Sequence, residues 1–203
     1  KRPLGTIGHL AAFSFHETKN IISGEGGLLT VNDPKYILRS EIIWEKGTNR
    51  TAFFRGEVDK YGWVDMGSSF LPSEVTAAFL WAQLEHIEEI QAKRISLWNR
   101  YYERKGFKLP DTPVHSTNNA HMFYLVCQGI EQQTLIIETL KSHNILSVFH
   151  YSSLHKSDFY KSKHDGRQLP YSDMYTESLV RLPLYYELTE RDVDRIVDII
   201  DGI

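Results

Sequence analysis

The stretch that decides the fold lies near the start of the chain and reads Phe13-Ser14-Phe15-His16-Glu17-Thr18-Lys19-Asn20, followed by Gly24-Glu25-Gly26-Gly27 and Leu28-Leu29-Thr30-Val31. Short apolar runs separated by glycines are typical of two strands joined by a turn. We therefore predict a buried strand that ends in a lysine-bearing turn, and a glycine hinge that leads into a second strand.

Lys19 is the residue of this stretch that is best suited to take part in a reaction. A charged lysine is costly at the end of a buried strand, and a neutral amine is a nucleophile toward aldehydes such as pyridoxal phosphate. Ser14 precedes it, and the glycine segment follows it, so a hydroxyl and backbone amides could gather around a phosphate group. The alternative is that Lys19 extends into solvent from a loop and has only a structural role.

The composition disfavours several kinds of partner. The 203 residues are 41% hydrophobic, enough for one large domain or two small ones. The 23 basic and 26 acidic residues are interspersed and leave a net charge of −3, which favours neither nucleic acid nor an anionic membrane as a partner.

Cys127 is the only cysteine, which excludes an internal disulfide and a cysteine-rich zinc site and fits a reducing cytoplasm. No apolar stretch approaches the roughly 20 residues that span a bilayer, and no signal peptide opens the chain, so we expect a cytoplasmic protein without membrane insertion. The chain begins with Lys1 in what looks like the middle of a domain. We therefore expect a fragment of a longer protein.

Downstream of the strand pair, Asp33 and Pro34 are a typical helix start, because Asp33 can cap free amides and Pro34 suits the first helical position. Residues 46–72 show neither helical nor strand periodicity and contain several glycines and aromatic residues. We expect this segment to be a long loop with a functional role.

A long helical pattern follows from Ser73, which is expected to cap it, and continues to Gly106. Because this length is unusual for one globular helix, we expect a break between residues 84 and 88. We place the domain boundary there, between residues 1–86 and residues 87–203.

Residues 87–203 are predicted to form a small α/β module. We expect strands over residues 122–127 and 145–149 with a helix over residues 132–143 between them, and then a second irregular stretch over residues 150–172.

The C-terminal end is predicted to contain one more apolar run, at residues 180–184, and a final helix. Thr189 and Asp192 approximate a capping box at the start of that helix. Its inward-facing residues are expected to be Val193, Ile196, Val197 and Ile200.

Three widely spaced motifs carry a family resemblance. Ser14-Phe15-x-x-x-Lys19-x-x-x-x-Gly24-Glu25-Gly26-Gly27 resembles the cofactor-lysine signature of the DegT/DnrJ/EryC1/StrS sugar-nucleotide aminotransferases. His150-Tyr151-x-x-Leu154-His155 resembles that family's HYxPLH segment, with Ser153 in place of proline. Leu182-Pro183-Leu184 and Leu188-Thr189-Glu190 resemble its LPL…LT ending.

The resemblance spans essentially the whole chain and implies a fold of the α/β class, that of a fold-type I pyridoxal phosphate-dependent transferase. It further implies that residues 1–86 are the C-terminal part of the cofactor-binding large domain and that residues 87–203 are the small C-terminal domain.

The same resemblance implies roles for individual residues. Lys19 would hold pyridoxal 5'-phosphate covalently and, once displaced by glutamate, would move the proton at the α-carbon of the amino acid. Ser14 would donate a hydrogen bond to the cofactor phosphate. Ser69 aligns with the asparagine of the family's GYN segment, which reaches the phosphate of the neighbouring subunit's cofactor.

Four further residues are candidates for substrate binding. Arg50 and Arg55 either pair with the nucleotide diphosphate or with glutamate carboxylates, or lie on the surface without such a role. His150 and Tyr151 are expected to line the sugar pocket. No metal role is expected, because His150 and His155 are badly spaced for a shared ion.

Three segments resemble one branch of the family most closely: residues 15–20, residues 45–50 and residues 119–124. This branch implies transfer of an amino group from glutamate to C4 of a dTDP-linked 4-keto-6-deoxyhexose, for cell-surface polysaccharide synthesis. It also implies a homodimer with shared active sites.

Two alternatives stay open. One is a non-catalytic remnant or interaction module of the same fold, in which Lys19 is only structural. The other is a pyridoxal phosphate-dependent deoxysugar dehydratase, although related dehydratases carry histidine in place of the lysine. In the family, the aspartate for the pyridine nitrogen and the phosphate-binding helix amides lie upstream of the lysine, and neither is identifiable here. We therefore expect that these 203 residues alone do not transaminate.

Overall fold

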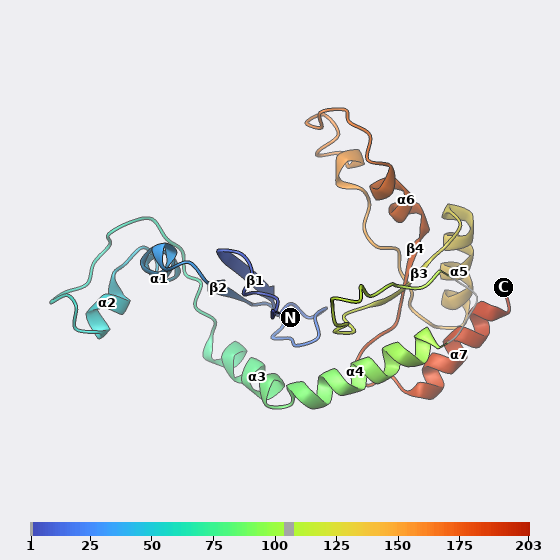
Figure 1. The fold of residues 1–203 in the computed structure, drawn as a ribbon, viewed down its shortest axis with the longest axis horizontal. Helices are drawn as coiled ribbons and strands as arrows, with labels where there is room; N and C mark the ends of the chain where they lie inside the picture. Colours follow the sequence, from blue (N-terminus) through green and yellow to red (C-terminus); the bar gives the residue numbers. More distant parts are fainter. Residues whose placement is uncertain (1, 104–107) are drawn as a thin grey trace. The chain divides into compact units, whose positions relative to one another are not determined.

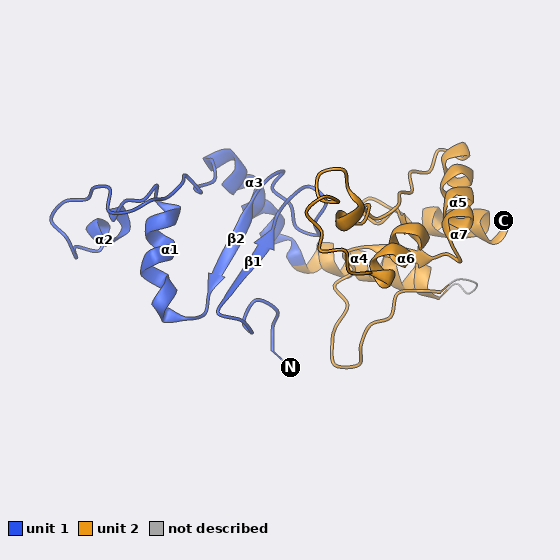
Figure 2. Cartoon of the chain, turned by 90° about the horizontal axis from the view of Figure 1, so that it is seen from above, with its two compact units in different colours: residues 1–87 blue, residues 88–203 orange. Residues whose placement is uncertain are grey.

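The structure is a computed structural model that describes residues 2–103 and 108–203. The chain divides into two compact units, residues 1–87 and residues 88–203, which Figure 2 shows in different colours. Both units contain helices and strands, so the fold is mixed α/β (Figure 1).

Unit 1 contains an antiparallel hairpin of β1 (Leu10–Ser14) and β2 (Gly27–Val31), in which Ser14 lies opposite Gly27. Close packing explains the glycine at position 27, because a Cβ atom there would lie 2.9 Å from the carbonyl oxygen of Phe13. The predicted strand pair is thus confirmed.

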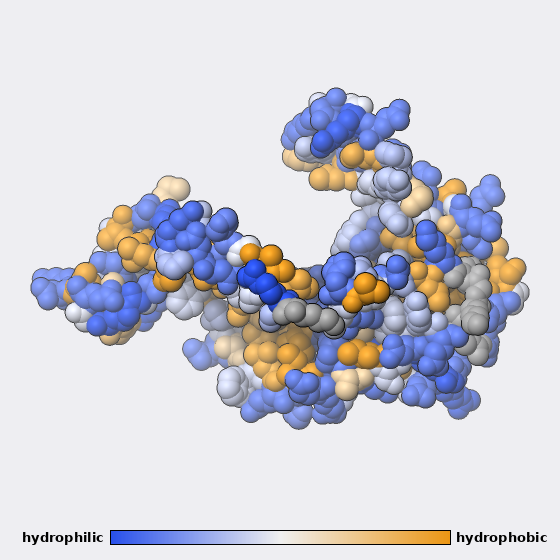
Figure 3. All heavy atoms as spheres, viewed as in Figure 1, coloured by the Kyte–Doolittle hydropathy of each residue, from blue (hydrophilic) through white to orange (hydrophobic). Residues whose placement is uncertain are grey.

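The prediction that the first strand is buried is wrong. Phe13 is 40% exposed and Leu29 on the paired strand is 54% exposed. Backbone pairing between the two strands forms the hairpin, and the rest of unit 1 does not enclose its apolar side chains. Figure 3 likewise shows apolar residues at the surface over the part of the chain that contains α1 and α2.

The first helical segment of unit 1 begins where the sequence predicts. The carboxylate of Asp33 accepts a hydrogen bond from the backbone amide of Lys35 at 3.1 Å. Pro34 opens the 3-10 helix η1 (Pro34–Tyr36), which continues into α1 (Ile37–Trp44). No residue of α1 is buried.

Residues 46–72 are more structured than the predicted irregular loop. They contain α2 (Arg50–Phe54), and antiparallel bridges join Glu45 to Ser69 and Thr48 to Trp63. Gly47 has a φ of +82° and approaches the backbone so closely that a Cβ atom would fall 2.0 Å from the carbonyl oxygen of Asp65. Backbone contacts between distant residues hold this segment, and such contacts leave no periodic pattern in the sequence.

The long helical pattern is interrupted as predicted. α3 (Glu74–Glu85) begins after Ser73, whose hydroxyl oxygen accepts a hydrogen bond from the amide of Thr76 at 3.1 Å. α4 (Ile87–Tyr102) begins two residues after α3 ends, with His86 between them. α3 has no buried residue, whereas α4 buries residues such as Leu97 and Tyr101.

The sheet of unit 2 consists of β3 (Phe123–Val126) and β4 (Leu179–Leu182) in antiparallel register, with Tyr124 opposite Arg181. One isolated bridge joins Lys108 to Val126, and another joins Val148 to Arg181. The strand predicted over residues 145–149 is therefore reduced to a single bridge at the sheet edge, because only Val148 shares backbone hydrogen bonds with β4.

Helices pack on one face of this sheet and enclose a core. α5 (Ile130–Ser142) begins two residues before the predicted start, and α7 (Glu190–Asp201) begins at the predicted capping box of Thr189 and Asp192. Fully burying one Leu or Ile side chain contributes about 1.5–3 kcal/mol. The residues that form the core with α4 include Phe123, Leu125, Ile136, Leu140, Val180, Leu182, Val193, Ile196, Val197 and Ile200.

The segment predicted as irregular over residues 150–172 contains the 3-10 helix η2 (Leu154–Lys156) and the start of α6 (Pro170–Ser178). Cys127 lies in the core of this unit, and its burial raises the pKa of the thiol to about 11. Within the described residues, no helix is both long and apolar enough to cross a membrane.

Candidate cofactor-lysine site

The turn that carries Lys19 is held by backbone hydrogen bonds across its base. The amide of Phe15 donates to the carbonyl of Gly26 at 2.9 Å, and the amide of Ser23 donates to the carbonyl of Phe15 at 2.8 Å. The amide of Lys19 itself donates to the carbonyl of His16 at 2.9 Å. The hairpin thus extends as ordered structure up to the lysine.

The side chain of Lys19 is half-buried, and no hydrogen-bond acceptor or carboxylate within the described residues pairs with its amine. Most lysines on protein surfaces extend freely into water or form weak ion pairs. A half-buried amine without a partner, on a turn held by backbone bonds, is instead available to react with an aldehyde.

Ser14 and His16 flank the lysine from the end of β1. The hydroxyl oxygen of Ser14 accepts a hydrogen bond from the amide of His16 at 3.3 Å, which leaves its proton available for donation to a phosphate oxygen. Nδ1 of His16 accepts from the amide of Thr18 at 3.2 Å, and Nε2 lies 3.6 Å from Glu25. These local contacts fix the orientation of the histidine ring.

One candidate donor for a cofactor phosphate lies on the same hairpin as Lys19. Ser14 and Lys19 lie on one hairpin, and Ser14 has a hydroxyl proton to donate. Ser69, the other phosphate candidate, is exposed and lies beside Glu45 in an antiparallel bridge.

Arg50 is paired within unit 1. Its guanidinium lies 3.1 Å from the carboxylate of Glu45, whose side chain is only 8% exposed, and 4.8 Å from the ring centre of Phe54. Since the carboxylate is largely out of water, the pair is held more firmly than an ordinary surface ion pair.

Arg55 is paired on two sides. It makes two hydrogen bonds to Glu57, at 2.7 and 3.2 Å, and two to Glu41, at 2.8 and 3.0 Å. The Glu57 and Glu41 carboxylates raise the pKa of Arg55 above its ordinary value, and Arg55 lowers the pKa of Glu57. An incoming substrate anion must therefore displace carboxylates from Arg55 before it can bind there.

The two candidates of unit 2 differ in exposure. Nδ1 of His150 is buried and has no hydrogen-bond partner within the described residues. Burial, and then the charge of Arg181, lower the pKa of His150. Tyr151 is 73% exposed, adopts a φ of +54°, and contacts the His150 ring at a centroid distance of 5.0 Å.

Ser153, which stands where the family pattern has proline, is a buried hydrogen-bonding residue. Its hydroxyl lies 2.7 Å from the hydroxyl of Thr176 and 3.2 Å from the carboxylate of Asp173. Asp173 also pairs with Lys156 at 3.0 Å and His155 at 3.1 Å, and the Lys156 hydrogen bond is the main cause of its lowered pKa. The substitution therefore ties the His150 segment to α6.

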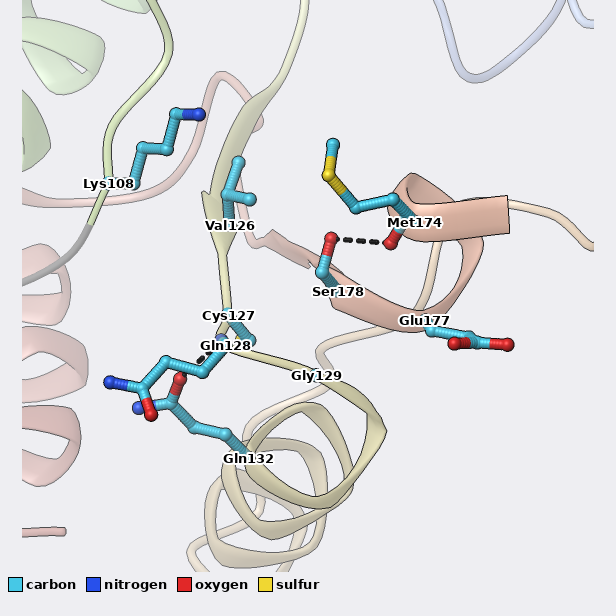
Figure 4. Close-up of a pocket in the computed structure, with 9 residues that line it drawn as sticks. All are labelled: Lys108, Val126, Cys127, Gln128, Gly129, Gln132, Met174, Glu177 and Ser178. Carbon is cyan, nitrogen blue, oxygen red and sulfur yellow. Dashed lines mark hydrogen bonds between the residues drawn. The ribbon is translucent and has the colours of Figure 1, made fainter. Parts of the chain in front are cut away.

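Figure 4 shows a cavity of about 480 Å³ in unit 2, between the start of α5 and the end of α6. In that view the amide of Gln128 bonds to the side chain of Gln132, and the Ser178 hydroxyl bonds to the carbonyl of Met174. The polar groups at the mouth of this cavity are thus partly engaged with one another. Within the described residues, no cluster of three or more potential metal ligands is present.

Two charged residues were not identified from the sequence as site candidates. Glu45 is buried beside Arg50, and Arg181 interrupts the apolar run of β4. The sequence did contain a signal for Arg181, namely a charge inside the apolar run Val180-Arg181-Leu182. An arginine within such a strand must face away from the core. No comparable pattern marks Glu45.

Comparison with known proteins identifies the class of the fold. A model of the DegT/DnrJ/EryC1/StrS aminotransferase family matches residues 1–201, and the chain therefore belongs to this family. The solved structures that resemble it are aminotransferases of fold type I, so the predicted fold class is confirmed.

One solved relative is a DegT/DnrJ/EryC1/StrS aminotransferase from Brucella abortus, which is 26% identical and has a TM-score of 0.81, over 98% of this chain and 52% of that one. Another is a putative sugar aminotransferase from Streptococcus pneumoniae in its pyridoxal phosphate form, 23% identical with a TM-score of 0.81, over 99% of this chain and 53% of that one. Aminotransferases of this family use pyridoxal phosphate, as predicted for the cofactor.

An uncharacterised protein of Methanocaldococcus jannaschii is 27% identical to the chain over 100% of this chain and 55% of its own length. The chain thus spans about half the length of the relatives that it matches. The predicted family is confirmed.

Proposed function

We propose that this chain is the lysine-bearing part of a pyridoxal phosphate-dependent sugar-nucleotide 4-aminotransferase, with glutamate as amino donor and a dTDP-linked 4-keto-6-deoxyhexose as acceptor. The observation that carries the proposal is the half-buried amine of Lys19, which has no partner within the described residues of a chain from an aminotransferase family.

The proposal takes as its particular reaction that of dTDP-4-amino-4,6-dideoxygalactose transaminase, which serves enterobacterial common antigen synthesis. The support for this choice is the likeness of residues 15–20, 45–50 and 119–124 to that branch. The proposal includes a homodimer, because Ser69 aligns with the asparagine through which family members reach a neighbouring subunit's cofactor. It also includes a cytoplasmic location, which the single cysteine, Cys127, fits.

When bound, pyridoxal phosphate supplies an electron sink that allows a proton to leave the α-carbon of an amino acid. Lys19 would hold the cofactor and, when released from it, carry that proton as a general base and acid. Among the residues that the structure describes, no carboxylate pairs with the amine, which favours this second role because a lysine in an ion pair would have to break it before accepting a proton.

The other candidate residues would bind and orient the cofactor and the substrates. Ser14 would donate its free hydroxyl proton to a phosphate oxygen of the cofactor. Arg50 and Arg55 would take up the diphosphate or glutamate carboxylates only by exchanging their present carboxylate partners. His150 and Tyr151 would line the sugar pocket, His150 as the half-buried member of the pair and Tyr151 as the exposed one.

The proposed function is tested with the full-length protein, glutamate and dTDP-4-keto-6-deoxyglucose. We expect one molecule of 2-oxoglutarate for each amino sugar formed. Lys19→Arg should lower the rate by about 1000-fold or more, because it removes both the nucleophile and the general base. Lys35→Arg, at an exposed lysine that pairs with Asp33, is the matched control and should leave the rate unchanged.

Two results would contradict the proposal. Loss of an oxygen from the sugar without formation of 2-oxoglutarate would identify a dehydratase. An unchanged rate in Lys19→Arg would show that Lys19 is only structural, as in a non-catalytic module.

A further inference from the structure

Arg181 occupies the middle of β4 and lies between two neighbouring chain segments. Tyr124 of β3 is opposite it on one side, and Val148 is opposite it on the other. The amide of Arg181 donates to the carbonyl of Val148 at 2.7 Å, and the amide of Val148 donates to the carbonyl of Arg181 at 3.2 Å. The backbone at Arg181 is therefore fixed from both sides.

The side chain of Arg181 lies on the face of the sheet opposite the core. Burial alternates along β4, where Val180 and Leu182 are buried and Arg181 is half-buried. The same alternation in β3 places Tyr124 on the half-buried face. Successive side chains of a strand point to opposite faces, so Arg181 and Tyr124 share the half-buried face opposite the core, where Tyr175 of α6 and Asp111 also lie near Tyr124.

Arg181 has no carboxylate partner within the described residues, in contrast to Arg50, Arg55 and Arg100. A half-buried guanidinium without a counter-ion retains five donors in a planar arrangement that matches the oxygens of a carboxylate or a phosphate. Removing such a charge from water costs free energy unless an anion pairs with it.

His150 adds a second donor next to Arg181. His150 lies two residues after Val148, which pairs with Arg181 through two backbone hydrogen bonds. Burial, and then the charge of Arg181, lower the pKa of the imidazole. Nδ1 of His150 is buried without a partner within the described residues, so one ring nitrogen is out of water and unsatisfied. An anion shared between the two side chains would satisfy the arginine and favour the charged histidine.

We propose that Arg181 and His150 form an oxyanion-binding pair on the half-buried face of the unit 2 sheet, which binds phosphate or carboxylate oxygens of the anionic substrates. The inference deepens the proposed function, since it assigns anion recognition to Arg181 as well as to the paired arginines of unit 1. The two substrates offer the same oxyanion chemistry, one as a diphosphate and the other as carboxylates.

The pair is tested by NMR spectroscopy of the full-length protein with isotope-labelled histidine. The resonances that disappear in His150→Asn are assigned to the His150 ring. Pyrophosphate represents the sugar nucleotide, and glutarate represents the amino donor. We expect at least one probe to shift the His150 resonances in a saturable manner. We also expect it to bind more tightly at about pH 6 than at about pH 8, because binding favours the protonated ring.

Two variants separate a binding role from a structural one. Arg181→Gln should weaken the binding of the probe by about 10-fold or more, and Arg181→Lys should recover part of it, because charge and donor number both contribute. Arg191→Ala removes an equal charge from an exposed position in the first turn of α7 and should change affinity by less than about 2-fold. Unfolding midpoints of all variants control for folding.

Pyrophosphate binding alone would place the diphosphate at the pair, glutarate binding alone would place the donor carboxylate there, and binding of both would support an unselective oxyanion site. No saturable shift with either probe at about 10 mM, or equal affinity in Arg181→Gln and the unaltered protein, would overturn the proposal. Neither probe needs the cofactor, so the result is independent of whether Lys19 binds pyridoxal phosphate.

Discussion

Unit 2 encloses its apolar side chains, whereas unit 1 leaves many of its own exposed. Leu140 and Val193 of unit 2 are 0% exposed, but Leu38 and Leu29 of unit 1 are 58% and 54% exposed. Unit 2 is therefore organised by a core between helices and a sheet. Unit 1 is organised by backbone pairing, close glycine contacts and ion pairs, and Lys19 lies on this scaffold.

The largest expected effect of this difference is on stability. Leu140→Ala in α5 should destabilise the chain by about 2–5 kcal/mol, because it removes fully buried methyl groups and leaves a cavity. Leu38→Ala in α1 is the matched change on an exposed helix and should stay within about 0.5 kcal/mol. Urea unfolding of both variants measures the difference. Equal losses would show that unit 1 has a core of its own.

The reactivity of the Cys127 thiol measures how well the core of unit 2 is shielded from solvent. Because burial raises its pKa from 9.0 to about 11, its thiolate fraction near pH 8 should be about 100-fold lower than in the unfolded chain. Alkylation with iodoacetamide, followed by mass measurement, should be slowed at least to that extent in the native protein relative to the protein in urea. Similar rates in the two conditions would mean that the core of unit 2 opens readily.

The helix caps of the two units should differ by a smaller amount. Thr189→Ala removes the capping box of α7, whose inner face lies in the core, and should lower the free energy of unfolding by about 1 kcal/mol. Ser73→Ala removes the equivalent cap of α3, which has no buried residue, and fraying there should cost less global stability. Chemical unfolding followed by tryptophan fluorescence compares them. A larger loss in Ser73→Ala would reverse the comparison.

The smallest effect is a pH dependence from His150. Since burial and Arg181 lower its pKa in the folded state, the unfolded chain binds more protons as the pH falls below about 6.5. His150 therefore contributes stability that is present above its unfolded pKa and is lost as the pH falls through that value toward its folded pKa. The stability of the unaltered protein should decline more between about pH 7 and pH 5 than that of His150→Gln. If the free energies of unfolding of the two proteins changed with pH in parallel, His150 would not be the source of the pH dependence.

The sequence was sufficient where the determinants of structure are local. Asp33, Ser73 and the Thr189–Asp192 pair begin helices at the predicted places, because a capping side chain bonds to amides only a few residues away. The strand pair around Lys19 was also predicted, from apolar runs on either side of glycines.

The sequence was insufficient where distant residues determine structure or exposure. The bridges of Glu45 to Ser69 and of Thr48 to Trp63 join segments without periodicity, so residues 46–72 were predicted to be irregular. The apolar composition of β1 predicted burial, but burial depends on what packs against a strand, and composition does not specify this.

For the candidate site, too, the sequence predicted residues within one local motif but not the partners that come from distant segments. Lys19 and Ser14 follow from a motif within one hairpin, where Ser14 ends β1 and Lys19 lies in the connection to β2. The carboxylate partners of Arg55 come from α1 and from the segment after α2, so the sequence did not show that this arginine is already paired. Arg181 was visible only as a charge inside an apolar run, and only the folded chain shows that no carboxylate in its described part pairs with this arginine.

The central claim, that Lys19 is the cofactor lysine, is tested most directly by reduction of the full-length protein with borohydride in the presence of pyridoxal phosphate, followed by peptide mass analysis. We predict a pyridoxyl adduct on the peptide that contains Lys19, and its loss in Lys19→Arg. An adduct confined to other lysines, or no adduct at all, would contradict the claim.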